Sequence, residues 1–436
     1  MTNNKLNLEQ SVKPMKPMHA GGQPPVVSGG GDGYFHYLTE AGIPYSRLHD
    51  VGGAYGCNRY VDIPNIFRDF DADENDPASY DFTFTDSLLA QLVKAGVEPY
   101  YRLGVTIENA AGIKSYRIDP PSDYEKWARI CEHIIRHYTE GWADGFRYKI
   151  TYWEIWNEPE NYGVMWKSTK EEYFRFYHTV ATYLKGKFPH LKFGGYAACG
   201  FYAEVGGGDP WNPDNPEAGR HLIDYFHAFM KFIKEKGSPI DFFSWHSYAP
   251  ADKTLAMDAW LHRQLVSYGY GDLETHLNEW DPYHWELGTA HHAAEIAATL
   301  IGLQKGHTDA AFIYDMRTAN APFCPLFSPI THKPIHGYYP LVAFNTLYRL
   351  GTQVVCESDT EGVYALAASN GKKHAMMLSN LSGKRQPLSF EGVDFMGARF
   401  YVIDNERLLS WAPRICAANG ACALEPNDVY LVEWEG

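Results

Sequence analysis

The stretch Thr151-Tyr-Trp-Glu-Ile-Trp-Asn157-Glu158-Pro159-Glu160 decides the fold of this chain. Its aromatic and β-branched residues suit a buried strand, and Pro159 ends that strand because proline has no N–H to donate to a neighbouring strand. Asn157 and Glu158 therefore lie at the C-terminal end of a strand. In a closed barrel of parallel strands, this end carries the chemistry.

A second acidic residue has the same setting far downstream, in Glu274-Thr-His-Leu-Asn278-Glu279-Trp280-Asp281-Pro282. Like Glu158, Glu279 follows an asparagine at the end of a strand-like run. Breaking a glycosidic bond requires one carboxyl group that donates a proton and a second that stays ionised. The sequence therefore predicts that Glu158 and Glu279 act as a pair.

Strand-like and helix-like segments alternate along most of the chain. The predicted strands are 12–18, 44–50, 97–103, 148–156, 191–198, 240–245, 274–278 and 310–315. The predicted helices are 34–41, 84–95, 124–138, 169–187, 218–236, 257–268, 289–305 and 339–350. Eight strands, each followed by a helix, is the number at which a parallel sheet closes into a (β/α)8 TIM barrel.

After residue 350 the pattern changes to short alternating runs separated by Gly, Asn and Ser turns. This change predicts a small C-terminal antiparallel β-sandwich domain. The expected organisation is an N-terminal arm at 1–10, the catalytic barrel at 11–350 and the β-sandwich at 351–436. A length of 436 residues accommodates a barrel and one satellite domain.

The composition argues against several classes of partner. A formal net charge of -15 predicts no nucleic acid and no anionic membrane as partner, because clustered Lys and Arg bind both. No apolar run reaches the roughly 20 residues of a membrane span. The first residues lack the apolar segment of a secretory signal, so we expect a cytoplasmic protein, or a secreted or periplasmic one if a signal peptide was removed.

The seven cysteines are odd in number and form no CxxC pair. Free thiols are therefore expected, rather than a disulfide framework or a zinc site. We expect no cofactor and no metal. The sequence is compatible with a homo-oligomer and does not fix the oligomeric state.

Trp156-Asn157-Glu158-Pro159 on the fourth strand, with a Glu ending the seventh, resembles the glycoside hydrolases of clan A. Within the clan the chain is most similar to family 39, which includes β-xylosidases and α-L-iduronidases. Supporting segments are Lys13 to His19, Ser46 to Asp50, Trp166 to Tyr173, Asp241 to Tyr248 and Lys333 to Tyr338. The resemblance covers about residues 11–350.

The resemblance implies a retaining mechanism, in which Glu158 is the general acid/base and Glu279 the nucleophile. It also implies that Arg47 and Tyr248 hold Glu279 ionised. An arginine beside Glu279 and a less polar surrounding for Glu158, which raises the pKa of Glu158, give the two carboxyls opposite roles.

The same resemblance implies that His246 supports the acid/base region and that His49 and Asn157 bind sugar hydroxyls. Trp280, next to the second acid, is expected to form part of the pocket wall. Structural roles stay open for two of these residues: Arg47 as the partner of an acidic loop, and His246 as a satisfied core histidine.

Other acids compete with the chosen pair. Glu154 lies further down its strand, and Glu160 lies beyond Pro159. Asp281 and Glu286 follow the strand end that Glu279 occupies, and both stay open as substrate contacts. Two arginines, Arg102 and Arg317, are expected either to face a charged or branched sugar or to form ion pairs.

The expected activity is exo-acting hydrolysis of a terminal sugar from an oligosaccharide or glycoside, because long loops after the second, fifth and eighth strands favour a closed pocket. The alternatives are an endo-glycanase of the same clan and a catalytically silent sugar-binding barrel. The sequence contains no Gly-x-Ser-x-Gly element, which argues against a nucleophilic-serine hydrolase. The segment His291-His292-Ala-Ala-Glu295 lacks the His-Glu-x-x-His order of a metalloprotease. The sequence does not identify the sugar or the linkage.

Overall fold

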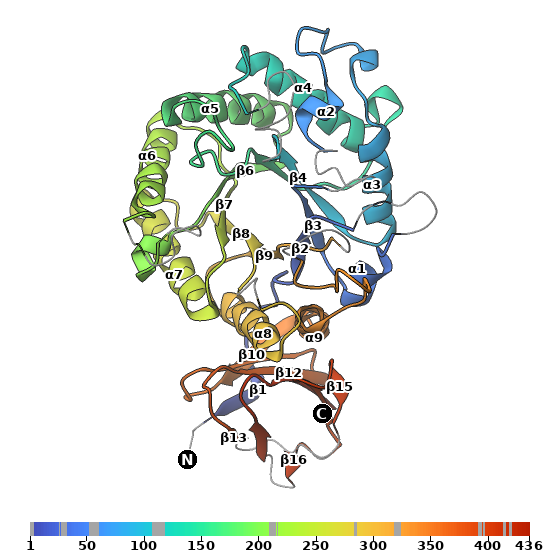
Figure 1. The fold of residues 1–436 in the computed structure, drawn as a ribbon, viewed down its shortest axis with the longest axis vertical. Helices are drawn as coiled ribbons and strands as arrows, with labels where there is room; N and C mark the ends of the chain where they lie inside the picture. The colour runs from blue at the N-terminus through green and yellow to red at the C-terminus, as the bar shows by residue number, and fades with distance from the viewer. Residues whose placement is uncertain are drawn as a thin grey trace.

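The computed structural model describes residues 4–25, 27, 33–51, 61–106, 118–208, 215, 217–282, 286–317, 324–390, 395, 397–412, 416–417 and 421–436. It contains a closed barrel of eight parallel strands and a separate C-terminal domain of antiparallel strands (Figure 1). The predicted fold class is therefore confirmed.

Each barrel strand pairs with its neighbours in parallel, in the order of the chain. The strands are β2 (Ala20–Gly22), β3 (Tyr45–Leu48), β4 (Glu98–Leu103), β5 (Tyr152–Ile155), β6 (Lys192–Ala198), β7 (Phe242–Ser247), β8 (Glu274–Trp280) and β9 (Ala310–Ile313). The outer helices are α1 (His36–Ala41), α3 (Thr83–Lys94), α4 (Tyr124–Thr139), α5 (Lys170–Lys187), α6 (Arg220–Lys236), α7 (Ala251–Tyr268), α8 (Ala290–Lys305) and α9 (Tyr339–Tyr348). A short helix, α2 (Ile63–Ile66), precedes α3.

The first barrel strand is not where the sequence predicted it. Instead of 12–18, the barrel uses Ala20–Gly22, and Lys5–Pro14 forms strand β1 of the C-terminal sheet, antiparallel to β10 (Thr352–Glu357). Prolines 14 and 17 explain the difference, because neither can donate the N–H that a strand paired on both sides requires. Most of the residues expected to form an N-terminal arm therefore belong to a sheet.

Side chains cap the helices α4, α5 and α8. The side chain of Thr169 accepts the N–H of Glu172, and the side chain of Thr289 caps α8. The cap of α4 is Asp123, which accepts the N–H of Lys126, and not the neighbouring Ser122. Both residues suit the position, so residue type alone did not separate them.

The C-terminal domain consists of two antiparallel sheets. The larger sheet has the order β1-β10-β11-β12-β18-β14-β15, and the smaller has the order β13-β17-β16. Their remaining strands are β11 (Val363–Ser369), β12 (Lys373–Asn380), β13 (Gln386–Ser389), β14 (Arg399–Ile403), β15 (Ser410–Trp411), β16 (Cys416–Ala417), β17 (Ala421–Leu424) and β18 (Val429–Glu435). Figure 1 shows α8 and α9 between the barrel and this domain. At this junction Ser379 donates a hydrogen bond to the carbonyl of Ala294 at 2.7 Å.

Aromatic residues fill the lower interior of the barrel. Tyr100, Phe242 and Phe312 form a small buried cluster, and the ring of His276 stacks on Phe242 at 4.7 Å. Because alternate residues of a strand share a face, Arg102 lies on the same face of β4 as Tyr100 and one layer higher. The barrel is therefore plugged below, and the site lies above the plug.

None of the helices within the described residues combines the length and the apolar character needed to span a membrane. Four cysteines are free: Cys131, Cys199, Cys324 and Cys356. The expectation for Cys57, and for the side chains of Cys416 and Cys422, lies outside the described residues.

Candidate active site

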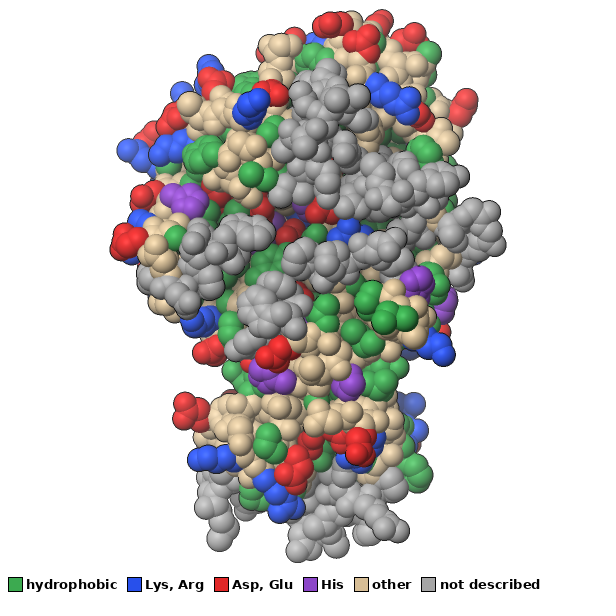
Figure 2. Space-filling view, in the orientation of Figure 1, with side chains coloured by type: hydrophobic (Ala, Val, Ile, Leu, Met, Phe, Trp, Pro, Cys, Tyr) green, Lys and Arg blue, Asp and Glu red, His purple; other side chains and the backbone are tan. Residues whose placement is uncertain are grey.

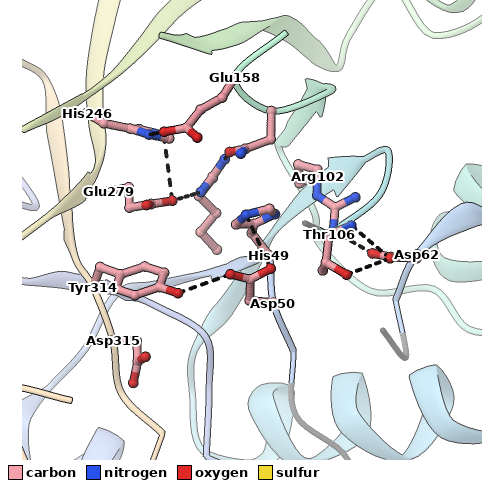
Figure 3. A network of polar contacts seen from close by, with 12 residues as sticks. His49, Asp50, Asp62, Arg102, Thr106, Glu158, His246, Glu279, Tyr314 and Asp315 are labelled. Carbon is pink, nitrogen blue, oxygen red and sulfur yellow. Dashed lines mark hydrogen bonds and ion pairs between the residues drawn. The ribbon is translucent and has the colours of Figure 1, made fainter. Parts of the chain in front are cut away.

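Glu158 and Glu279 come together at the C-terminal edge of the barrel. One oxygen of each carboxylate and one ring nitrogen of His246 lie within 4.8 Å of one another. Figure 3 shows these three side chains facing one another, with His49 nearby. In Figure 2 acidic, basic and histidine side chains are visible where the surface is hollowed over the centre of the barrel.

A strained turn at the end of β5 places Glu158. Trp156 and Glu158 have left-handed backbone conformations, with φ of 73° and 45°. Such a conformation costs about 1–3 kcal/mol for a residue other than glycine, so surrounding contacts must hold it. The N–H of Glu158 lies 3.2 Å from the carbonyls of both Tyr196 and Ala197 on β6, and these contacts fix the turn.

Arg47 on β3 joins the acids of two other strands. Its Nε donates to Glu154 at 2.8 Å, its Nη1 donates to Glu279 at 3.1 Å and its Nη2 donates to Asn157 at 2.6 Å. Burial lowers the pKa of Arg47, but Glu154 and Glu279 outweigh burial and raise it, so the guanidinium stays charged. The structural alternative, in which Arg47 pairs with an acidic loop, is therefore wrong.

Both carboxylate oxygens of Glu279 accept hydrogen bonds. Arg47 donates to Oε2, and the hydroxyl of Tyr248 on the segment after β7 donates to Oε1 at 2.5 Å. Charge-assisted hydrogen bonds of this kind favour the ionised carboxylate and restrict its rotation. This arrangement holds the Glu279 carboxylate in one orientation.

His246 on β7 contacts both acids. Its Nδ1 lies 2.7 Å from Oε1 of Glu158, and its Nε2 lies 3.8 Å from Oε2 of Glu279. The imidazole is fully buried, yet its partners are the two candidate carboxylates rather than the core. The reading of His246 as an ordinary core histidine is therefore wrong.

The expected rise in the pKa of Glu158 is contradicted for the protein without substrate. Burial raises this pKa, but the hydrogen bond and charge of His246, with smaller contributions from Cys199 and Arg47, lower it further than burial raises it. The sequence indicated an apolar surrounding. It did not show that an imidazole would lie within hydrogen-bond distance of the carboxylate.

Two further predicted residues lie near the acids. Asn157 is held by Arg47, and His49 is 3% exposed. Burial first, and then the charges of Arg102 and Arg47, lower the pKa of His49 well below its usual value, so its ring is neutral. A neutral imidazole can both donate to and accept from a hydroxyl group.

Trp280 follows Glu279 directly on β8. It is 1% exposed and belongs to the main hydrophobic core. Its expected place in the pocket wall stays a prediction. Adjacent residues of a strand point to opposite faces, which separates Trp280 from its neighbour Glu279.

Sequence reasoning missed the layer beneath the acids. Glu154 is fully buried on β5, and its Oε1 accepts hydrogen bonds from Ser244 of β7, at 2.6 Å, and from Asn278 of β8. Its other oxygen accepts from Arg47. A charged residue in the middle of an apolar strand was the available signal, since such a residue requires buried partners.

The remaining charged residues have separate partners. Asp281 lies 2.7 Å from His292, and Glu286 lies 2.6 Å from His291, so the two histidines do not converge on one point. The Glu158, His246 and Glu279 group already has the Arg47 cation against it, which disfavours a metal ion there. We therefore assign this group to carboxylate chemistry.

Replacing Arg47 with methionine is expected to destabilise the fold by about 3–5 kcal/mol, because Glu154 and Glu279 then stay buried without their cation. Urea unfolding followed by circular dichroism measures the change. Arg68→Met is the matched control, since Arg68 pairs with Asp81 on the surface with 64% of its side chain exposed. Its loss should be under about 1 kcal/mol. Equal losses in both variants would contradict a structural role for the Arg47 network.

Comparison with known proteins gives a consistent family match. The sequence model described as "Glycosyl hydrolases family 39" matches residues 60–301, more than half of the chain. A β-xylosidase from Geobacillus stearothermophilus is 28% identical over 222 residues, which are 49% of this chain and 38% of that protein. A β-xylosidase from Caldicellulosiruptor saccharolyticus is 24% identical over 354 residues, 72% of this chain and 66% of that protein. The matched regions therefore span less than two thirds of these relatives.

Solved structures share the fold over the whole chain. A glucosidase from Croceicoccus marinus superposes with a TM-score of 0.77 at 18% identity, covering 99% of this chain and 98% of its own. A monomeric β-xylosidase from Caulobacter crescentus superposes with a TM-score of 0.70 at 16% identity, covering 100% and 99%. At these identities the likeness establishes the architecture alone.

Proposed function

Because this chain belongs to glycoside hydrolase family 39, we propose that it is a retaining glycosidase that removes a terminal neutral sugar from an oligosaccharide or glycoside. One observation carries the proposal. Glu158 and Glu279 lie with His246 inside a 4.8 Å group at the mouth of the barrel. Retaining enzymes hold their carboxyls about 5–5.5 Å apart, whereas inverting enzymes need about 6.5–9.5 Å to admit a water between acid and sugar.

The hydrogen bonds suggest which acid takes which role. Glu279, which accepts hydrogen bonds from Arg47 and Tyr248, attacks the anomeric carbon and forms a glycosyl–enzyme bond while Glu158 gives its proton to the leaving oxygen. Water then attacks the anomeric carbon from the side of Glu158, which takes the water's proton, and the bond to Glu279 breaks. Two inversions at one carbon give net retention.

Proton donation requires Glu158 to be protonated in the substrate complex. In the free protein the contact with His246 lowers its pKa, while burial acts in the opposite direction. A bound sugar removes more water from the site and so adds to the effect of burial. His246 Nδ1, at 2.7 Å from Glu158, is placed to hold a proton that the carboxyl and the imidazole share.

The ion pairs support a neutral sugar. Three arginines act electrostatically on His49, namely Arg102, Arg47 and Arg317. Each is already paired: Arg102 with Asp62 at 2.7 Å, Arg47 with Glu154 and Glu279, and Arg317 with Asp315 at 2.6 Å. Arg102 and Arg317 both form ion pairs, which is one of the two roles expected for them, and contact with a sugar stays a prediction. A sugar carboxylate would compete with the carboxylates that pair with Arg47 and Arg317, whereas Nε and Nη1 of Arg102 have no hydrogen-bond partner among the described residues.

The two relatives named β-xylosidases support exo action on a β-xyloside, while the similar structure named a glucosidase points to a β-glucoside as the other neutral candidate. Parts of the long loops that favoured exo action from the sequence, 52–60, 209–214 and 318–323, lie outside the described residues. An endo-glycanase of the same clan is the second candidate.

A panel of p-nitrophenyl β-xyloside, β-glucoside, β-galactoside, α-L-arabinoside and β-glucuronide tests the substrate. We expect turnover of at least one neutral glycoside and none of the glucuronide. Proton NMR in the first minutes of turnover tests the stereochemistry, with the β-anomer expected to appear first from a β-glycoside. Initial appearance of the α-anomer would contradict the retaining mechanism.

A further inference from the structure

Glu160 lies two residues beyond the acid/base and has no part in the reaction described above. Its side chain is 1% exposed. One oxygen accepts the backbone N–H of Cys199 at 2.7 Å, and the other, Oε2, is buried with no hydrogen-bond partner among the described residues. A charged carboxylate is costly in such a place, whereas a neutral carboxylic acid is tolerated.

The groups that face Glu160 offer no positive charge. No described Lys, Arg or His forms an ion pair with it. Its neighbours come from its own loop, from β6 and the residues after it, and from two helices: Glu158, Tyr162, Tyr196, Cys199, Tyr173 of α5 and Tyr225 of α6. Burial, and then the negative charge of Glu158, raise the pKa of Glu160 to about 8, although the N–H of Cys199 lowers it.

Cys199 connects the two glutamates. Its backbone N–H donates to Glu160 at 2.7 Å, and its thiol interacts electrostatically with both Glu158 and Glu160. The backbone N–H of Glu158 is held separately by the carbonyls of Tyr196 and Ala197. The strained turn that carries Glu158 is therefore attached to the end of β6 at two points, of which the Glu160 side chain is one.

We propose that Glu160, in its uncharged form, is a positioning residue that clamps the Glu158 turn to the end of β6 and so fixes the place of the proton donor. The inference rests on the proposed function, because it requires Glu158 to be that donor. A displaced donor slows the first chemical step, which kcat/KM reports, only where the leaving group needs a proton.

Leaving groups of different basicity test the clamp. The substrates are the phenyl and 2,4-dinitrophenyl glycosides of the preferred sugar. Dinitrophenolate leaves without a proton, whereas the more basic phenolate needs one. Glu160→Ala should lower kcat/KM at least about tenfold on the phenyl glycoside and less than about threefold on the dinitrophenyl glycoside. Glu160→Gln keeps an uncharged group that accepts the Cys199 N–H, and should stay within about threefold of the wild type on both.

Glu295→Ala is the matched control. Glu295 is also a buried glutamate, 6% exposed, and it accepts a backbone N–H, from Ala251 at 2.8 Å. Loss of the Glu295 side chain should lower kcat/KM equally on both glycosides, or on neither of them. A loss in Glu160→Ala that is equal on the two glycosides would overturn the positioning role.

Thermal unfolding of the wild type and Glu160→Gln tests the uncharged state without any assay of activity. The pKa of Glu160 is raised in the folded protein from 4.5 to about 8, so the folded state binds the proton more tightly than the unfolded state. Glu160 therefore reduces stability progressively as the pH rises from about 4.5 to about 8, whereas glutamine does not titrate. The Tm of Glu160→Gln minus that of the wild type should grow from pH 5 to pH 8. A difference that does not change with pH would overturn the uncharged clamp.

Glu158→Gln, assayed on the same two glycosides, separates the inference from the proposed function. If the loss of kcat/KM in Glu158→Gln depends steeply on the leaving group, and the loss in Glu160→Ala does not, the clamp alone is overturned. If the loss of kcat/KM in Glu158→Gln does not depend on the leaving group, Glu158 is not the donor, and the clamp is overturned with it. If Glu160→Ala does not fold, the pH dependence of Glu160→Gln decides the inference.

Discussion

Glu279→Gly is expected to lower kcat on an aryl β-glycoside by at least about 10⁴-fold, because no other described group can form the bond to the anomeric carbon. The cavity left by the side chain gives azide access to the face that Glu279 occupied. Azide should therefore restore turnover and yield an α-glycosyl azide from a β-glycoside. Release of the aryl group is measured by absorbance, and the configuration of the azide by NMR.

Glu286→Gln is the control for this variant. Glu286 also follows the strand end of β8, but its carboxylate is held 2.6 Å from His291. We expect its turnover to remain within about threefold of the wild type, as for a side chain outside the bond-breaking group. If Glu286→Gln lost as much activity as Glu279→Gly, or if azide gave the β-product with Glu279→Gly, Glu279 would not be the nucleophile.

Glu158→Ala is expected to lower kcat/KM by about 10²–10⁴-fold on glycosides with basic leaving groups and far less on a dinitrophenyl glycoside. With the activated substrate, the bond to Glu279 forms but is hydrolysed slowly, because no base activates the water. Azide needs no base and should accelerate this second step. The product should be a β-glycosyl azide, opposite in configuration to that from Glu279→Gly.

The opposite azide products identify the two acids independently of rate. A loss of equal size on all leaving groups, or an α-azide from Glu158→Ala, would remove Glu158 from the role of acid/base. Circular dichroism spectra of each variant should match the wild type. Arg47 and Glu154 stay in place in both variants, so the buried ion pair beneath the acids is preserved in each.

Most of the barrel was predictable because its signals are local. Apolar runs that end in polar residues located the strands β3 to β9, and Thr169 marked the start of α5. The first strand was misplaced because a three-residue strand, Ala20–Gly22, is too short to show a period. The pairing of β1 with β10 joins residues more than 330 positions apart, and no local pattern encodes such a contact.

The candidate acids were predictable, but their partners were only partly so. Glu158 and Glu279 each end a run of strand residues, and closure of a parallel barrel brings such ends to one face. The sequence placed Arg47, Tyr248 and His246 near them only through the family resemblance. It gave no indication that Glu154 would share the Arg47 cation.

The sequence by itself determined an eight-stranded barrel and two acids on its working face, because alternation and strand ends are properties of consecutive residues. Only the tertiary structure decided the pKa values of Glu158 and Glu160. The distance from His246 to Glu158 lowers one pKa, and the burial of Glu160 without a cation raises another. Such shifts depend on distances between strands and on excluded water, and these exist only once the barrel has closed.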